Sequence, residues 1–312
     1  MTDYLGVGKV SEKIVEAISK GIGTLYKPRA IRHEADAHAY EKKVIGEAEL
    51  AVAKAKALSD FELHATTKIQ ESDLNFQLAL RAKERLLACE IQNQKNIEEI
   101  AAFALEDVPA EASVNAVDDD WVRTFFRYGK EVSNAIMQSV WAKVLQSEIT
   151  QPDSFSLRTL QVLSTMGQSD LILFKKFLSL CDVHGRVPCP PPINDFEKYT
   201  RDNYLDVVGI SYPKICLLKE IGLIGEPEFC ASMRYYIPGK EGDLDVVMAV
   251  KFTTGTAIFY RLDKNQKDFV FYCYSLTSVA RELSRLAIVN SEVGYLDAVA
   301  SSYNTSVEFN RI

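Results

Sequence analysis

Apolar residues recur at three- and four-residue steps near the start of the chain, over residues 4–26, and this spacing predicts an amphipathic helix. Its apolar stripe consists of Val7, Val10, Ile14, Ile18, Ile22 and Leu25, and Lys9, Lys13 and Lys20 lie largely between them. Each glycine in this segment costs the helix on the order of 1 kcal/mol relative to alanine, so the helix needs a surface to pack against. The rest of the fold, a second copy of the chain or a bilayer interface could each supply that surface.

The next pattern is a long segment of helix-forming residues from Arg29 to Val108, which contains no proline. An unbroken helix of this length would reach ~110 Å, so we expect a hairpin or a projecting stalk. We expect interruptions near Thr66-Thr67 and Glu71-Ser72-Asp73, where short polar side chains compete for backbone hydrogen bonds. The segment contains two heptad seams that do not join. The first consists of Ile45, Ala48, Val52 and Ala55. The second, which has a gap, consists of Ile69, Phe76, Leu80, Leu87 and Ile91. Self-association and an internal hairpin both remain open.

Shorter helical segments, richer in aromatic residues, follow a polar linker at residues 109–120. The pattern predicts helices from Trp121 to about residue 150, divided near Gly129, and two more before the proline cluster at 188–192. We expect this helical domain to have a core that includes Trp121, Phe125, Trp141, Leu145 and Leu160.

The pattern changes after the proline cluster. A helix that ends on Gly222 precedes β-branched and aromatic runs separated by turn residues, and these runs predict strands. The runs cover residues 233–237, 245–252, 256–262 and 269–275. Two further helices are expected, one from Leu276-Thr277 and one from about Glu292 to Ser302. Helices followed by a small antiparallel sheet and a helix indicate a winged-helix-like arrangement.

The predicted fold is therefore mainly α with a small antiparallel β-sheet. Four parts are expected: the amphipathic helix (1–27), a long helical rod or hairpin (28–108), a compact helical domain (109–187) and a winged-helix-like α+β domain (188–312).

Composition and charge narrow the possible partners. The chain has 312 residues, 47% hydrophobic and 25% charged, which is typical of a globular protein. Its formal net charge is −7, with 36 Lys and Arg against 43 Asp and Glu. Nucleic acid is not an expected partner, because non-specific affinity depends on neutralising many phosphates with basic side chains.

The cysteines indicate a cytoplasmic protein. All six are isolated in the sequence and form no C-x-x-C pair, so we expect reduced thiols. The N-terminus lacks the pattern of a signal peptide, and no run of ~18 apolar residues occurs. We expect a cytoplasmic location, with any membrane contact peripheral to the inner membrane.

Candidate motifs for chemistry are weak. The segment GVGKVS (6–11) departs from a phosphate loop, because Val10 follows Lys9 where Ser or Thr is needed. Cys181, His184 and Cys189 are three potential zinc ligands without a fourth nearby. The polar groups His33, Glu34, Asp36 and His38 fit a solvated helix face, and Asp118-Asp119-Asp120 fits a helix start. We therefore expect no catalytic residue, no metal and no cofactor.

Two strings carry a resemblance to known families. GIGTLYKPRAIRHEADA (21–37) and SVWAKVLQSEITQPDSFSLRTLQVLSTMGQSDLILF (139–174) resemble a bacterial family catalogued as a domain of unknown function. The arrangement of an N-terminal glycine-bearing segment, a charged helix and a helix pair is more distantly similar to the Abi-alpha family, which is linked by name to abortive phage infection. The resemblance implies a bacterial or prophage-borne role in defence and supplies no catalytic residues.

These patterns favour a non-enzymatic, homo-oligomeric helical protein. The N-terminal helix and the rod would mediate assembly or peripheral membrane contact, and the part from Trp121 onward would bind a protein partner. Two alternatives stay open: a winged-helix nucleic-acid-binding regulator, and a hydrolase centred on His184, the one histidine that lies outside the rod.

Overall fold

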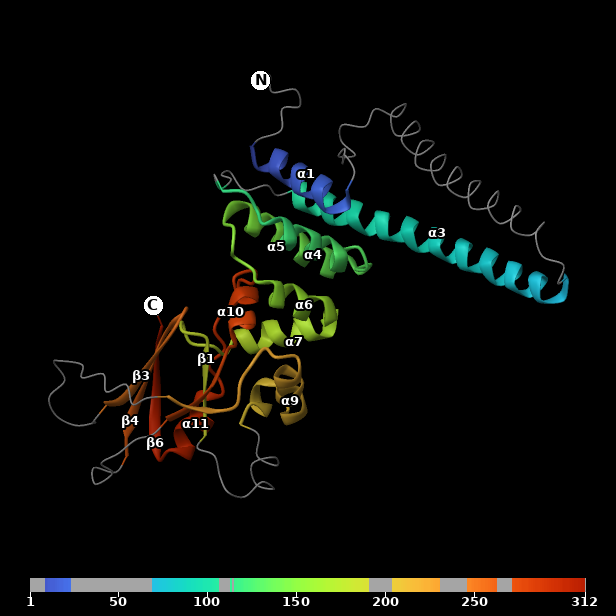
Figure 1. Ribbon diagram of the computed structural model, residues 1–312. Helices are drawn as coiled ribbons and strands as arrows, with labels where there is room; N and C mark the ends of the chain where they lie inside the picture. The colour runs from blue at the N-terminus through green and yellow to red at the C-terminus, as the bar shows by residue number, and fades with distance from the viewer. Residues whose placement is uncertain are drawn as a thin grey trace. The chain divides into compact units, whose positions relative to one another are not determined.

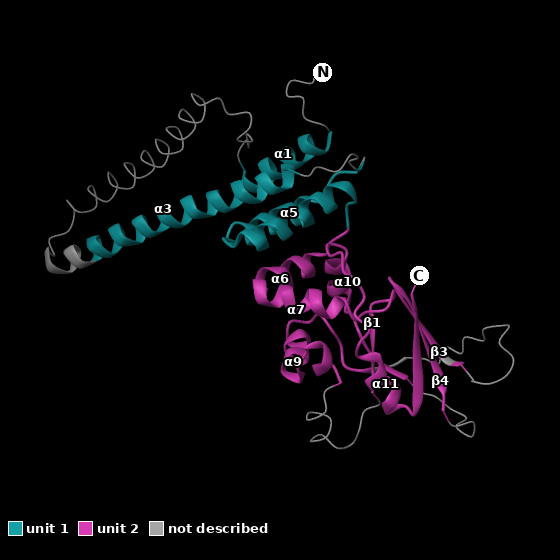
Figure 2. Cartoon of the chain, turned by 180° about the vertical axis from the view of Figure 1, so that it is seen from behind, with its two compact units in different colours: residues 1–153 teal, residues 154–312 magenta. Residues whose placement is uncertain are grey.

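The computed structural model describes residues 9–23, 69–106, 113, 115–190, 204–230, 246–262 and 271–311. The chain forms two compact units, residues 1–153 and 154–312 (Figure 2). The described residues are mainly helical and form two small antiparallel sheets. The predicted fold class is confirmed, with two sheets where one was expected.

Four helices make up the described part of residues 1–153, and Figure 1 shows them side by side. They are α1 (Lys9–Ile22), α3 (Ile69–Glu106), α4 (Asp119–Gly129) and α5 (Ala135–Thr150). Asp118 caps α4 by accepting a hydrogen bond from the Trp121 amide at 2.8 Å, and Asn134 caps α5 by accepting one from the Met137 amide at 3.1 Å. These caps place the two helix starts close to where the sequence pattern put them.

Aromatic side chains form the centre of this bundle. The Phe125 ring lies 5.2 Å from the Trp121 ring and 5.1 Å from the Trp141 ring, measured between centroids. These three side chains and Leu145 are buried. Leu160, which the sequence analysis grouped with them, is also buried, but it belongs to the core of residues 154–312.

Buried amide side chains satisfy the carbonyl groups left over at helix ends of the bundle. Gln146 in α5 donates to the Ala104 carbonyl in the last turn of α3, at 3.0 Å. Asn96 in α3 donates to the carbonyl of Lys130, the C-cap of α4, at 2.7 Å, and Gln138 donates to the Val132 carbonyl at 2.8 Å. These hydrogen bonds fix α3 against α5 and against the turn that leads into α5.

Residues 154–312 begin with two helices, α6 (Leu157–Thr165) and α7 (Gln168–Leu178). The start of α6 is held by Glu282 in α10 (Ser278–Ser284), whose carboxylate accepts from the Ser156 amide at 2.7 Å and from the Thr159 hydroxyl at 2.5 Å. Thr159 is fully buried, so this carboxylate joins two segments far apart in the sequence.

The first sheet has the strand order β1-β5-β2, with both pairs antiparallel. Its strands are β1 (Arg186–Cys189), β5 (Phe271–Ser275) and β2 (Glu228–Cys230). Between β1 and β2 the chain forms the short 3-10 helix η2 (Asp206–Val208) and α9 (Tyr212–Glu220). Val187 pairs with Tyr274, and Phe229 pairs with Tyr272.

The second sheet has the strand order β3-β4-β6 and is also antiparallel. It consists of β3 (Val246–Phe252), β4 (Gly255–Arg261) and β6 (Thr305–Arg311), and α11 (Leu296–Ser302) precedes β6. The Phe259 ring in β4 lies 5.4 Å from the Phe271 ring in β5, so the two sheets share a core. The Tyr303 hydroxyl donates to the Cys189 carbonyl at 2.8 Å and anchors the end of α11 to β1.

Most predicted strands are confirmed, and the corrections concern short or interrupted elements. Runs 245–252, 256–262 and 269–275 correspond to β3, β4 and β5, whereas 233–237 lies outside the described residues. No sequence pattern predicted β1, β2 and β6. The predicted interruption at Glu71-Ser72-Asp73 is wrong, because α3 runs through these residues. The helix predicted to end on Gly222 is divided at Gly209, which has a left-handed φ of 72°.

Candidate functional site

The N-terminal half of α3 extends beyond the other described helices of its unit, as Figures 1 and 2 show. Side chains at 75–92 are exposed or half-exposed, and continuous burial begins at Asn96. Ile97, Ile100 and Ala104 face the bundle and are buried. About half of α3 therefore lacks neighbours among the described residues.

This projecting half carries a row of large apolar side chains, here called the α3 stripe. Phe76, Leu80, Leu87 and Ile91 are 38%, 39%, 44% and 49% exposed. At 3.6 residues per turn they lie within about 60° of one another around the helix axis. They are turned by roughly 100° from the side chains that pack in the bundle, so the stripe is a separate apolar face.

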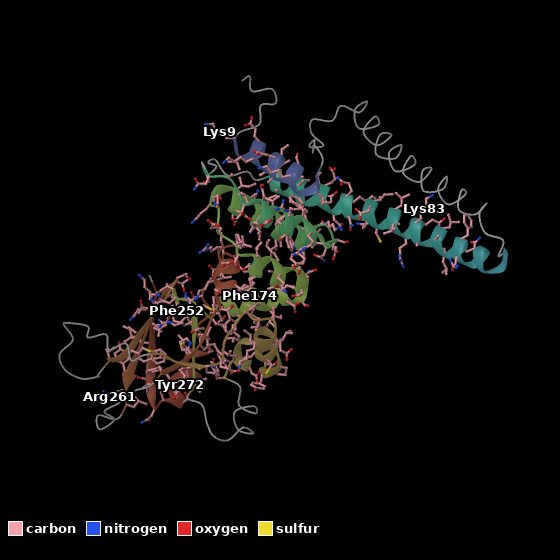
Figure 3. All side chains as sticks on the ribbon, viewed as in Figure 1. Lys9, Lys83, Phe174, Phe252, Arg261 and Tyr272 are labelled. Carbon is pink, nitrogen blue, oxygen red and sulfur yellow. The ribbon has the colours of Figure 1, made fainter. Side chains whose placement is uncertain are left out.

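Charged residues border the α3 stripe on both sides. Lys83 and Glu90 lie along one flank, and Glu84 and Lys95 lie along the other. Figure 3 shows Lys83 on the projecting part of α3. Each flank therefore carries one positive and one negative charge. The same face of a second copy would meet no net repulsion at either flank.

Burial of an apolar side chain of this size stabilises a complex by about 1.5–3 kcal/mol, and exposed apolar patches mark interaction sites. The α3 stripe is therefore suited to binding another apolar surface. The heptad spacing predicted these residues as one seam, but spacing alone does not show whether a seam is exposed.

The apolar face of α1 is buried within its own unit. Val10, Ile14 and Ile18 are buried where α1 packs on α4, α5 and α3, and Ile22 is half-buried. A Cβ added to Gly21 would lie 1.9 Å from Phe126 Cδ2, so the glycine permits close packing on α4. A membrane or a second subunit would reach these residues only if α1 left the bundle. Val7 and Leu25 lie outside the described residues.

The lysines of α1 have different surroundings. Lys13 donates to the carbonyl groups of Ser113 and Asn115. Lys20 forms ion pairs with Glu16 at 3.3 Å and with Asp119 at 3.6 Å, and these raise the pKa of Lys20. Lys9 is exposed (Figure 3). Two of the three lysines thus help to hold α1 to the bundle.

The segment from Cys181 to Cys189 forms a turn into β1. The carboxylate of Asp182 accepts from the amides of His184 and Arg186 and from the Arg186 guanidinium. Burial raises the pKa of the Cys181 thiol, and it raises the pKa of the Cys189 thiol to about 12. Both thiols stay protonated near neutral pH, which makes them poor nucleophiles and poor metal ligands.

The remaining candidates have structural roles or lie outside the described residues. Asp118 caps α4, Asp119 pairs with Lys20, and Asp120 pairs with Arg123. Residues 6–8 and the group from His33 to His38 are outside the described ranges. Among the residues that are described, no three His, Cys, Asp or Glu side chains are placed to hold a metal ion.

One cysteine departs from the expectation of reduced thiols. Cys89, Cys181, Cys189 and Cys216 are free, but Cys273 in β5 is disulfide-bonded. Cys273 lies in the middle strand of its sheet, where pairing brings distant segments together. Sequence spacing alone does not show such proximity.

The fold and the α3 stripe define a mainly helical protein with a strand-containing C-terminal part and an exposed row of apolar side chains on α3. The chain belongs to the family described as "Protein of unknown function (DUF2806)", which matches residues 80–300. This confirms the predicted membership in a family of unknown function, while the similarity to Abi-alpha stays a prediction. The matched range contains Leu80, Leu87 and Ile91 of the stripe. Comparison with curated proteins and with solved structures gives no match.

Over the described ranges, none of the helices combines the length and the apolar character needed to cross a bilayer.

Proposed function

We propose that the protein works by self-association, with copies joining through the α3 stripe, and that residues 154–312 bind a protein partner. The observation that carries this proposal is the row of four large apolar side chains exposed beyond the bundle. Leaving them in water is unfavourable, and a second copy offers the same apolar row with both signs of charge on each flank. No chemical step is part of the proposed role.

The experiment is a mass measurement on the full chain by size-exclusion chromatography with light scattering. We expect a mass that is a multiple of the 35.0 kDa chain. The double variant Leu80→Glu/Leu87→Glu should return it to 35.0 kDa, because two charges on each copy would have to be buried.

Leu78→Glu is the matched control, because Leu78 is 51% exposed on the opposite side of the same helix. It should leave the mass unchanged. A wild-type chain that runs at 35.0 kDa, or a stripe variant as large as wild type, would overturn the proposal.

The strand order of the first sheet and the outward face of α9 support the proposal that residues 154–312 bind a protein partner. The order β1-β5-β2, with α7 before β1 and with η2 and α9 between β1 and β2, is the order expected for a winged-helix-like module. The outward face of α9 holds Pro213, Lys214, Leu217 and Glu220. One basic and one acidic residue suit a protein surface better than a phosphate backbone. This favours a protein partner over the nucleic-acid-binding alternative.

The hydrolase alternative has less support. His184 lies in the turn held by Asp182, and the thiols beside it in the sequence are buried and protonated. A nucleophile near His184 would need a lowered pKa, which is opposite to the direction seen for Cys181 and Cys189.

Two finer parts of the proposal are peripheral membrane contact and a role in phage defence. Peripheral membrane contact requires α1 to leave the bundle, and flotation of the full chain with anionic liposomes tests it. Chain that stays at the bottom of the gradient would contradict this part.

A role in phage defence rests on the Abi-alpha resemblance alone. Equal plaque counts on cells with the wild-type chain and on cells without the chain would contradict it.

A further inference from the structure

Two lysine side chains from different helices meet at one glycine of residues 154–312. Lys176 is in the last turn of α7, and its Nζ lies 2.7 Å from the place that a Cβ on Gly209 would occupy. Lys214 is in the first turn of α9, and its Nζ donates to the Gly209 carbonyl at 3.0 Å. Gly209 has a φ of 72°, so a residue without a side chain both forms the turn and leaves room for the ammonium groups.

These two charges have no acidic partner within the described part of the chain. None of the ion pairs there includes Lys176 or Lys214. The acidic residue nearest to Gly209 in sequence is Asp206, which has an interaction of its own. In addition, Lys214 lies at a helix N-terminus, where the helix dipole disfavours a cation. An incoming anionic group would be attracted by both ammonium groups.

Exposed apolar side chains occur on α7 and in the turn that leads to Gly209. Ile172, one turn before Lys176 on the same face of α7, is 61% exposed. Val207, two residues before Gly209, is 68% exposed. Figures 1 and 2 show α7 and α9 next to each other in this unit, and the two helices pack together. We call Ile172, Lys176, Val207, Gly209 and Lys214 the α7–α9 surface.

We propose that the α7–α9 surface binds an acidic segment of a partner protein that also carries apolar side chains. Carboxylates of the segment pair with Lys176 and Lys214, and its apolar side chains cover Ile172 and Val207. The apolar residues favour a polypeptide over nucleic acid, whose backbone presents phosphates to every contact. Residues 155–312 carry 17 Lys and Arg against 18 Asp and Glu, which gives a net charge of −1 and no general attraction for phosphates.

This inference rests on the proposed role of residues 154–312 in binding a partner, and it is independent of self-association through α3. The test uses the full chain and fluorescence anisotropy with three labelled probes: a peptide of glutamate and leucine, the same peptide with lysine in place of glutamate, and a DNA duplex. We expect only the glutamate–leucine peptide to bind, with an affinity that falls as salt is raised.

The double variant Lys176→Glu/Lys214→Glu should weaken peptide binding by about 10-fold or more, because attraction becomes repulsion at both positions. Ile172→Ser should weaken it without changing its salt dependence. Lys251→Glu, at an exposed lysine of β3, is the matched control and should bind as wild type does. Circular dichroism checks that each variant is folded.

Three results would overturn the inference: no peptide binding, equal binding by wild type and the double variant, or DNA binding that the double variant abolishes. The last result would assign the same surface to nucleic acid. The mass of the α3 variants is a separate measurement. A negative peptide-binding result therefore leaves the proposed self-association standing, and a monomeric wild type leaves the proposed peptide binding standing.

Discussion

Trp141→Ala should lower the free energy of unfolding by about 3–5 kcal/mol, the usual cost of deleting a large aromatic side chain from a core. Trp141 is completely buried, and its ring packs edge-on against Phe125 at 5.1 Å. Ile100 lies close to the same place, because a Cβ on Gly129 would lie 3.4 Å from Ile100 Cδ1 and 3.7 Å from Trp141 Cε3. Removal of the indole would leave a cavity where three helices meet, and few of the neighbours could move to fill it.

The measurement is urea unfolding of the full chain followed by tryptophan fluorescence, with Trp121 as the remaining probe, since the chain has two tryptophans. Ile136→Ala in the same helix is the control, because Ile136 is exposed and should cost under about 0.5 kcal/mol. A loss below about 1 kcal/mol for Trp141→Ala would contradict the central position of this side chain.

Trp141→Phe refines the same test. The indole Nε1 is buried and has no hydrogen-bond partner among the described residues. Phenylalanine would remove this unsatisfied group while keeping a ring against Phe125, so we expect it to cost much less than alanine does. The difference between the two variants separates the packing of the ring from the polarity of its nitrogen.

The helices were predictable because their signals are local. The start of α4 follows from Asp118, which caps the first turn with its own side chain. The division near Gly129 located the start of α5 only to within a few residues. The end of α9 was located by Gly222, which has a φ of 84° just past the helix. The division at Gly209 was not predicted, because the apolar residues on both sides of it continue a helical pattern.

The short strands had no comparable local signal. β1 has four residues, includes Pro188 and pairs with β5, which lies far along the chain. β6 has exposed polar residues near its end and is a strand because it pairs with β4. Strand formation at such places depends on packing against partners, which a sequence pattern does not contain.

The α3 stripe and the α7–α9 surface also differ in how much of each the sequence predicted. The heptad spacing identified Phe76, Leu80, Leu87 and Ile91 as one face of a helix, but a repeat does not say whether that face is covered. The α7–α9 surface had no sequence signal at all. Lys176 and Lys214 are far apart in the chain, and the turn at Gly209 brings them together. Both surfaces therefore required the structure, although for different reasons.

Asp182→Ala should destabilise residues 154–312 by about 2–4 kcal/mol, because it removes the acceptor for four hydrogen bonds in one turn. The buried carboxylate accepts from the amides of His184 at 2.9 Å and Arg186 at 2.8 Å. It also accepts from Nε of Arg186 at 3.0 Å and from its Nη2 at 2.8 Å. Alanine would leave two amides and a largely buried guanidinium without a partner at the entry to β1.

Far-UV circular dichroism in urea measures the loss, because both tryptophans lie in residues 1–153 and do not report on this unit. Asp170→Ala is the matched control. Its exposed carboxylate accepts one hydrogen bond, from the Gly167 amide at 2.8 Å, so its removal should cost only about 1 kcal/mol. Equal losses for the two variants would show that the buried turn is no more important than an ordinary helix cap. A larger loss at Asp182 would mean that the turn between Cys181 and Cys189 is a structural element that positions β1.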